Sequence, residues 1–336
     1  MKRIGIFTLN GYFNYGNRLQ LFALSSTLHA ISNDYTIQVF WPQRFKKKIK
    51  EFLKYRTPFF GKFKKEAKLR SFTLRYIGKA TEDPDFDYSI IGSDQVWNPE
   101  YLKTRPFLLK VPNDSTKISY AASIGQSELS MSELEIFKEK LKEYKAISVR
   151  EKSAKELLRP LTDKEIEVVL DPTLLLDAAE YVKLEKKPSN IKEDEKYILC
   201  YILGGREQMD AINKLANEKG YRIILFSDKK ESNYGVEEFL YLIHHAQLIC
   251  TDSFHACVFS FIFDRPFVVF RRTGEANNMY TRLQNLIETF NLKGREFNGK
   301  KITAENVDVN YKDAKEILKK EQEKSLNFLK EALEIE

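Results

Sequence analysis

The stretch QLICTDSFHACVFSFIFDRPFVVF, residues 247–270, decides the fold. It opens with a short β-rich run at 247–251 and continues with an apolar segment of helical length at 253–263. A second β-rich run closes it at 266–270. Two strands joined through a helix lie parallel, because a parallel pair needs a crossover connection. The stretch therefore predicts a β-α-β unit whose apolar body is buried.

The same alternation of short β-rich runs and helical patterns extends along most of the chain. Predicted strands lie at 3–8, 36–40, 88–92, 117–123, 146–150, 167–170, 197–202, 221–226, 247–251 and 266–270. Predicted helices lie at 17–31, 132–144, 151–158, 206–219, 236–245, 253–263 and 279–290. Such alternation is typical of an α/β protein with parallel sheets covered by helices on both faces.

The length of 336 residues favours two domains, since single domains usually span about 100–200 residues. An apolar run gives way to a charged stretch after residue 175, so we expect two doubly wound, Rossmann-like domains facing each other across a cleft. The predicted boundaries are 1–175 and 176–310. Apolar residues at helical spacing then predict an amphipathic helix over 311–336.

The net charge of +7 comes from one segment, residues 44–70, which holds twelve Lys or Arg against two acids, interleaved with aromatic residues. One interpretation is a solvated helical excursion with a few core anchors. The other is a basic surface that contacts an anionic membrane face or an acidic substrate such as a polyprenyl diphosphate. We expect no nucleic-acid partner, because no recognised binding module surrounds the segment.

Targeting and metal signals are absent from the sequence. The N-terminus is too polar for a signal peptide, and no apolar run reaches the length of a membrane span. The three cysteines, Cys200, Cys250 and Cys257, lie in apolar segments and are predicted to be core thiols. We therefore expect a cytoplasmic protein, with the inner face of the membrane as an alternative location, and no metal and no cofactor.

Polar residues gather where predicted strands pass into helices, which is where open α/β sheets bind ligands. After the first strand come Asn14, Asn17 and Arg18, at the start of a helix. After the strand at 88–92 come Asp94, Trp97 and Asn98. An aromatic face beside carboxylate and amide groups is typical of a sugar site, and the alternative is an Asp-capped turn with Trp97 in the core.

Two further positions can bind an anion or move a proton. Arg150 ends a predicted strand, where it could hold a carboxylate or phosphate, the alternative being a surface ion pair with Glu151 or Glu156. Asp252 or Ser253 is a natural helix N-cap, which places His255 in the first turn beside unpaired N–H groups. The alternative for His255 is a structural role, which we also assign to His29, His244 and His245.

These segments together resemble the polysaccharide pyruvyl transferase family. The resemblance is carried by NYGNRLQLFAL at 14–24, DYSIIGSDQVWNP at 87–99, SYAASIG at 119–125, ISVREKSAKELL at 147–158, VLDPTLLL at 169–176 and TDSFHACVFSFIFDRPFVVF at 251–270. It extends to YTRLQNLIETFNL at 280–292, covers about residues 1–295, and leaves out the basic segment 44–70.

The resemblance implies two Rossmann-like halves similar to glycosyltransferase-B enzymes. It also implies transfer of the enolpyruvyl group of phosphoenolpyruvate to two hydroxyls of a sugar, giving a cyclic pyruvate ketal and phosphate. The acceptor would be a hexose of a cell-envelope glycan, as in capsule or exopolysaccharide, or its lipid-linked precursor. Phosphoenolpyruvate is then a substrate, and no separate cofactor is implied.

The roles implied for single residues follow from that reaction. His255 is expected to act as acid and base, Arg150 as an anion clamp and Asp94 as a further catalytic group. Asn14, Asn17, Arg18, Trp97 and Asn98 are expected to bind the acceptor. Asp252 and Ser253 are expected to bind the donor, together with Arg271 and Arg282.

Ser253 marks a departure from the family pattern. Many members have an arginine at this position, two residues before the matching histidine, so this chain resembles an SFH-type branch. The negative charge of the donor must therefore be bound by another arginine. The candidates are Arg206, Arg271, Arg272 and Arg282.

Two other functions compete with the pyruvyl transferase hypothesis. One is a nucleotide-sugar glycosyltransferase of the same architecture, although the second domain has no evident acidic pair to bind the nucleotide. The other is a non-catalytic member of a glycan-assembly complex.

Overall fold

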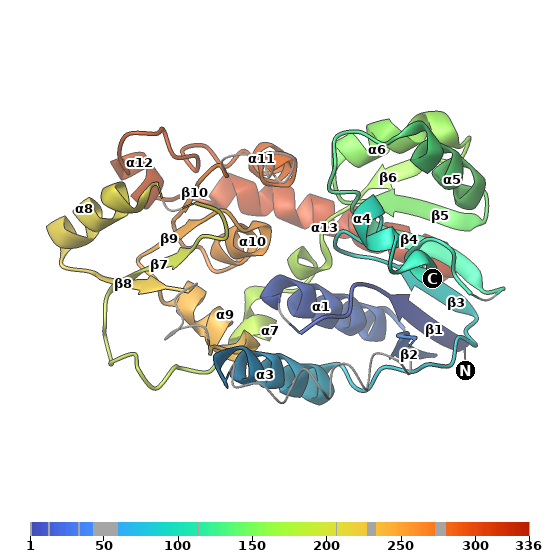
Figure 1. Ribbon diagram of the computed structural model, residues 1–336, viewed down its shortest axis with the longest axis horizontal. Coiled ribbons are helices and arrows are strands. Elements are labelled where there is room, and N and C mark those ends of the chain that lie inside the picture. Colours follow the sequence, from blue (N-terminus) through green and yellow to red (C-terminus); the bar gives the residue numbers. More distant parts are fainter. Residues whose placement is uncertain are drawn as a thin grey trace. The chain divides into compact units, whose positions relative to one another are not determined.

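The computed structural model describes residues 2–12, 14–32, 34–42, 60–112, 114–205, 207–226, 233–272 and 280–335. The chain divides into two compact units, each described by itself (Figure 1). The first unit comprises Met1–Leu175 and Glu323–Glu336, and the second comprises Leu176–Gln322.

The first unit is built on a six-stranded sheet in the order β2-β1-β3-β4-β5-β6, in which every neighbouring pair is parallel. The strands are β1 (Lys2–Phe7), β2 (Tyr35–Val39), β3 (Tyr88–Ile91), β4 (Thr116–Ala122), β5 (Tyr144–Val149) and β6 (Ile166–Val168). The order reverses between β1 and β3, since β2 lies on one side of β1 and β3 on the other. Ligands of open α/β sheets bind at such a switch point, beyond the carboxyl ends of the strands.

Helices cover both faces of this sheet, as its alternating side chains require. They are α1 (Tyr15–Ile31), α3 (Phe60–Tyr76), α4 (Pro99–Leu102), α5 (Met131–Leu141) and α6 (Lys152–Leu158). Short 3₁₀ turns lie at Pro106–Leu108, Arg159–Leu161 and Pro172–Leu174. On β1, Ile4 and Ile6 pack with α1, whereas Phe7 belongs to the core that contains α5 and α6. Helix α3 lies beside α1 (Figure 1).

The second unit has a four-stranded parallel sheet in the order β10-β9-β7-β8. Its strands are β7 (Tyr197–Tyr201), β8 (Arg222–Leu225), β9 (Leu248–Thr251) and β10 (Phe267–Val269). Its helices are α7 (Ala178–Val182), α8 (Met209–Lys219), α9 (Val236–His244), α10 (Phe254–Ile262), α11 (Tyr280–Thr289) and α12 (Ala304–Val307). The strand order reverses between β7 and β9, so this sheet has a switch point of its own.

The last helix, α13 (Lys312–Leu333), carries apolar side chains into both units. In its first part Ala314 and Leu318 are buried, and in its last part Phe328, Leu329 and Leu333 join the core beneath β1 and β3. The unit boundary falls between Gln322 and Glu323, inside this helix.

The ten predicted strands are confirmed, each within two residues at either end, and so is the α/β class with parallel sheets. The seven predicted helices also form. Residues 43–59, most of the basic segment, lie outside the described residues, and its remainder belongs to α3. Cys200, Cys250 and Cys257 are buried free thiols, as predicted. None of the helices in the described ranges combines the length and apolar character that a bilayer span requires.

Candidate functional site

Polar side chains meet at the switch point of the first unit. Asn14 precedes α1, and its side chain accepts a hydrogen bond from the backbone N–H of Asn17 at 3.2 Å, so it is the helix N-cap. The side-chain amide of Asn17 donates to Asp94 Oδ2 at 3.2 Å. This bond joins the loop after β1 to the loop after β3, and Asn14 above it is exposed.

The loop that carries Asp94 needs a glycine at Gly92. Its φ of +140° is a conformation open to glycine, and a Cβ built there would lie 1.9 Å from the carbonyl oxygen of Tyr120 on β4. The chain therefore passes β4 closely enough to bring Asp94 over the strand ends. Asp94 then accepts from the N–H of Gln95 at 2.9 Å and is 8% exposed.

Beneath Asp94 lies a buried ion pair between Arg150 and Asp171. Arg150 Nη1 donates to Asp171 Oδ2 at 2.7 Å, and Ser93 Oγ donates to the same oxygen at 3.1 Å. Burial alone would lower the pKa of Arg150, but the charges of Asp171, Glu151 and Asp94 outweigh it and raise that pKa. Arg150 Nη2 lies 3.9 Å from Asp94 Oδ1. The surface location considered for the ion pair of Arg150 is therefore wrong, because Arg150 is buried and Asp171 is its closest partner, although Glu151 also lies within 3.8 Å.

Glu151 fixes the neighbouring loop. Its Oε1 accepts from Ser123 Oγ at 2.8 Å and from the N–H of Ile124 at 3.1 Å, while Oε2 lies 3.8 Å from Arg150 Nε. We call Asn17, Asp94, Arg150, Glu151 and Asp171 the first-unit cluster. Three carboxylates face one guanidinium group in it, so as it stands it suits hydroxyl groups better than a second anion.

Three residues that were predicted to bind the acceptor, Arg18, Trp97 and Asn98, have structural contacts instead. Arg18 is fully buried, where its guanidinium donates to Asn10 Oδ1 at 2.9 Å and to the carbonyl of Leu9 at 3.0 Å. Burial lowers the pKa of Arg18 to about 10. It therefore holds the loop after β1 and does not present its charge to a ligand.

The prediction that Trp97 offers its face to a sugar is wrong. Trp97 is 0% exposed, stacks edge-on against Phe137 and Tyr144, and donates from Nε1 to the carbonyl of Leu108 at 3.2 Å. Asn98, also buried, caps α4 by accepting from the N–H of Glu100 at 3.0 Å. The alternative of an Asp-capped turn with a core tryptophan is confirmed for Trp97, whereas the residue that caps α4 is Asn98.

Lys65 on α3 adds a cation close to the start of α1. Its Nζ lies 4.2 Å from the ring centroid of Tyr15, a cation–π contact. Burial lowers the pKa of Lys65 to about 8.

At the switch point of the second unit, Asp252 is the centre of the contacts. Its carboxylate accepts from the N–H of Leu203 at 2.8 Å and of Gly204 at 2.7 Å, which joins the end of β7 to the end of β9. Arg272 Nε donates to the same carboxylate at 2.9 Å, and Arg272 Nη2 to the carbonyl of Asp252 at 3.2 Å. Asp252 is therefore bound inside the unit and does not cap the next helix.

Ser253 holds the N-cap position of α10, although its side chain makes no capping hydrogen bond. Its own N–H donates to Thr251 Oγ1 at 3.0 Å. His255 follows in the first turn, buried and edge-on to Phe254 at 5.2 Å between ring centroids. Helix α10 thus begins, as predicted, directly after the aspartate, with the histidine at its positive end.

The four arginines considered as donor ligands have different surroundings. Arg271 is exposed, pairs with Glu296 at 3.1 Å and lies over the ring of Tyr280. Arg282 is buried in α11, and Arg206 lies outside the described residues. Arg272 alone among the described three is bonded to Asp252. We call Asp252, His255 and Arg272 the second-unit cluster.

Asp171 is a site residue that the sequence interpretation left without a role, whereas Arg272 was only one of four donor candidates and Glu151 only a possible ion-pair partner. A pattern of neighbouring residues cannot reveal the contacts of Arg272 and Asp171, because Arg272 is 20 residues from Asp252 and Asp171 is 21 residues from Arg150. The only available signal was their position directly after a predicted strand, where parallel strand ends meet.

Solved structures of low sequence identity share the fold. A putative UDP-N-acetylglucosamine 2-epimerase from Listeria monocytogenes matches with a TM-score of 0.50 and 13% identity over 97% of this chain and 91% of its own. UDP-GlcNAc 2-epimerase from Neisseria meningitidis matches with a TM-score of 0.49 and 14% identity over 99% of both chains. A glycosyltransferase from Rickettsia africae gives 0.48 and 11%, also over 99% of both. The first likeness supports a two-domain α/β fold and nothing about activity.

Sequence comparison is more specific than these structural matches. No curated protein matches the chain closely enough to count as a relative. The family model of polysaccharide pyruvyl transferases, in contrast, matches residues 14–274. That range contains both clusters, from Asn14 to Arg272. The protein is therefore a transferase that acts on a glycan, and the chain belongs to the polysaccharide pyruvyl transferase family.

Proposed function

We propose that this protein transfers the enolpyruvyl group of phosphoenolpyruvate to two hydroxyls of one sugar. A proton adds to the methylene carbon of the donor, and C2 becomes an oxocarbenium-like centre. The two hydroxyl oxygens bond to C2, the C2–O bond to phosphate breaks, and a cyclic ketal results. The two sugar hydroxyls each lose a proton. One of these protons replaces the proton that was added to the methylene carbon, and the other leaves with the phosphate. The reaction needs a general acid, a general base and cationic groups for the donor.

The second-unit cluster carries this proposal. Arg272 is bonded to Asp252 through Nε and Nη2, and its Nη1 has no hydrogen-bond partner among the described residues. Its side chain is 16% exposed, so this donor group is open to a ligand. Arg272, which follows β10, provides the positive charge that an arginine at position 253 provides in many family members. His255 lies in the first turn of α10, and the positive end of a helix favours a phosphate or carboxylate.

Each residue then takes a role that its contacts allow. His255 is the general acid, Arg272 binds the donor carboxylate or phosphate, and Ser253 lines the same helix start. Arg282, buried in α11, remains a candidate donor ligand. Because Arg271 is engaged with Glu296 at the surface, we leave it out of the donor site.

In the first unit, Asp94 receives hydroxyl protons, and Asn14 and Asn17 bind the sugar. Arg150 acts as a positioning residue, since its guanidinium is bonded to Asp171 and lies 3.9 Å from Asp94. An anion beside Arg150 would also lie close to the carboxylates of Asp94, Glu151 and Asp171, and this repulsion makes a donor at this edge unfavourable.

We further propose that the acceptor is a lipid-linked precursor of a capsule, exopolysaccharide or other cell-envelope glycan, modified at the cytoplasmic membrane face. Lys64 and Arg70 on α3 are exposed and belong to the basic segment 44–70. Positive charge of this kind attracts anionic lipid headgroups. Co-sedimentation with anionic vesicles, and none with neutral vesicles, is the expected result. Equal binding to both would contradict the membrane role.

The donor is tested by comparing Arg272→Gln with Arg271→Gln, neighbouring arginines of which one faces Asp252 and the other Glu296. Phosphoenolpyruvate should raise the melting temperature of the wild type and of Arg271→Gln. It should have at least about ten-fold weaker affinity for Arg272→Gln, because a charge-assisted contact is lost.

Product formation completes this test. Incubation with phosphoenolpyruvate and lipid-linked oligosaccharides should release phosphate and add the mass of one pyruvate less one water. Stabilisation by UDP-GlcNAc and none by phosphoenolpyruvate would overturn the proposal in favour of a nucleotide-sugar glycosyltransferase. Unchanged cellular function of Arg272→Gln and His255→Gln would favour a non-catalytic assembly protein.

A further inference from the structure

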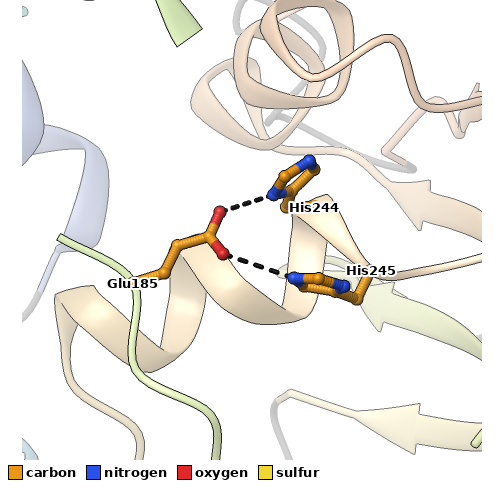
Figure 2. Close-up of side chains that lie close together, drawn as sticks. All are labelled: Glu185, His244 and His245. Atoms are coloured by element: carbon orange, nitrogen blue, oxygen red, sulfur yellow. Dashed lines mark hydrogen bonds and ion pairs between the residues drawn. The ribbon is translucent and has the colours of Figure 1, made fainter. Parts of the chain in front are cut away.

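Three side chains with metal-ligating atoms meet in the second unit, away from the second-unit cluster (Figure 2). Glu185 lies in the loop after α7, His244 is the last residue of α9, and His245 is its C-cap. His244 Nδ1 lies 2.7 Å from Glu185 Oε1, and His245 Nε2 lies 3.3 Å from Glu185 Oε2. Both imidazoles thus point at one carboxylate, one to each oxygen.

Aromatic contacts hold the two rings in this orientation. His244 stacks on Phe263 with ring centroids 4.6 Å apart, and His245 stacks on Tyr241 at 4.1 Å. The backbone N–H of Lys186 donates to the carbonyl of Glu237 at 3.2 Å, which attaches the loop of Glu185 to α9. The three ligand atoms are therefore preorganised by contacts that do not depend on one another.

The spacing suits a small divalent ion. The three atoms lie within 4.8 Å of one another. A tetrahedral zinc ion with bonds of about 2.0–2.2 Å places neighbouring ligand atoms about 3.3 Å apart. The two imidazole nitrogens lie 2.7 and 3.3 Å from different oxygens of Glu185, so binding through one of these oxygens requires the carboxylate to rotate.

The chemistry of the ligands favours zinc over magnesium or calcium. Imidazole nitrogen prefers zinc and its neighbours in the first transition series, whereas magnesium and calcium prefer oxygen. The side chains of Glu185, His244 and His245 are 9%, 25% and 43% exposed, which leaves the imidazole side open for an entering ion and a water ligand.

We propose that Glu185, His244 and His245 bind one Zn²⁺ ion that ties the loop after α7 to the end of α9. This site is separate from the second-unit cluster. His245 precedes β9 at its amino end, whereas Asp252 and His255 follow its carboxyl end. A four-residue strand separates the two ends by about 13 Å. The proposal does not depend on the identity of the donor or acceptor.

The test uses the full chain, purified without a polyhistidine tag and stripped with a chelator. Zn²⁺ is titrated against a chromophoric competitor into the wild type, Glu185→Gln and His245→Gln. His29→Gln is the matched control, because it removes an imidazole that bonds the carbonyl of Ser25 on α1. We expect one ion per chain in the wild type and in His29→Gln, and at least about ten-fold weaker binding in the other two variants.

Two further measurements decide between metal binding and a proton-sharing cluster. Zn²⁺ should raise the melting temperature of the wild type and of His29→Gln only. Co²⁺ should give the visible absorption of a four-coordinate site, and Mg²⁺ should not compete. Affinity equal in the wild type and both site variants would overturn the proposal, as would fewer than one ion for every two chains. Because His245 is partly exposed, His245→Gln keeps the test valid if Glu185→Gln folds poorly.

Discussion

The switch points of the two sheets each place an aspartate where the strand order reverses, yet their surroundings differ. Asp94 in the first unit lies over a buried Arg150–Asp171 pair, with Glu151 beside it. Asp252 in the second unit has one guanidinium, that of Arg272, which is partly exposed. The charges of the first-unit cluster are bound to each other, whereas the second-unit cluster keeps a donor group available.

This difference indicates that the two clusters have different roles. Buried charges that bond each other fix loop shape, because separating them leaves an uncompensated charge in a medium of low dielectric constant. A partly exposed arginine beside a helix start can exchange its solvent for an anionic ligand at a smaller penalty. We therefore expect Arg150 and Asp171 to hold the loops in place, and Arg272 to bind the negative charge of a ligand.

The largest expected effect is that of Asp171→Asn, compared with Asp252→Asn. Removing the carboxylate of Asp171 leaves Arg150 buried without its closest partner, and we expect the free energy of unfolding to fall by about 3–5 kcal/mol. Asp252→Asn keeps an acceptor oxygen for one of the two backbone N–H groups and loses the acceptor of the other, beside a partly exposed arginine, so the expected loss is about 1–2 kcal/mol. Urea denaturation followed by circular dichroism measures both. Equal losses would show that the two clusters do not differ in this way.

His255→Gln should separate catalysis from stability. If His255 is the general acid, kcat should fall by about 100-fold or more, equivalent to about 2.7 kcal/mol of transition-state stabilisation. The melting temperature should stay close to that of the wild type, because a polar side chain of similar size remains. Phosphate release and thermal denaturation are the measurements, with His29→Gln as the control. A variant with full turnover would remove His255 from the mechanism.

Trp97→Phe tests the assignment of the indole to the core of the first unit. The variant loses the hydrogen bond from Nε1 to Leu108 and some packing with Phe137, so stability should fall by about 1–2 kcal/mol. The KM for the acceptor should not change. An acceptor KM raised several-fold at unchanged stability would restore the sugar-binding role.

The last prediction concerns the charge of Lys65, which lies beside Tyr15. Burial lowers the pKa of Lys65 to about 8, whereas an unfolded lysine titrates near 10.4. Between these values the unfolded chain binds the proton that the folded chain has released, so the stability contributed by this group rises with pH. Lys65→Met should therefore be the more stable protein at pH 7, by a margin that shrinks between about pH 8 and 10.

Melting temperatures of wild type and variant over that pH range provide the check. Lys64→Met, which changes an exposed neighbour on the same helix, is the matched control. A margin that does not depend on pH would show that Lys65 is solvated in solution.

Individual residues show how far sequence reasoning reached. The helix start at α10 and the position of His255 followed from a short strand, a polar break and an apolar run of helical length. The same reasoning failed at Trp97, because an indole after a strand can face either solvent or core, and the local pattern is the same for both. It also favoured Arg271 over its neighbour Arg272, although adjacent side chains at a strand end point in opposite directions.

The strands, the helices, the parallel sheets and the family could be predicted from the chain alone, since they depend on local periodicity and on motifs read in order. Which charges meet became visible only in the folded chain: Arg150 with Asp171, Arg272 with Asp252, and Glu185 with His244 and His245. The partners in each set are 20 or more residues apart. The physical reason is that a parallel sheet gathers the ends of strands distant in sequence, and burial then requires each charge gathered there to find a partner.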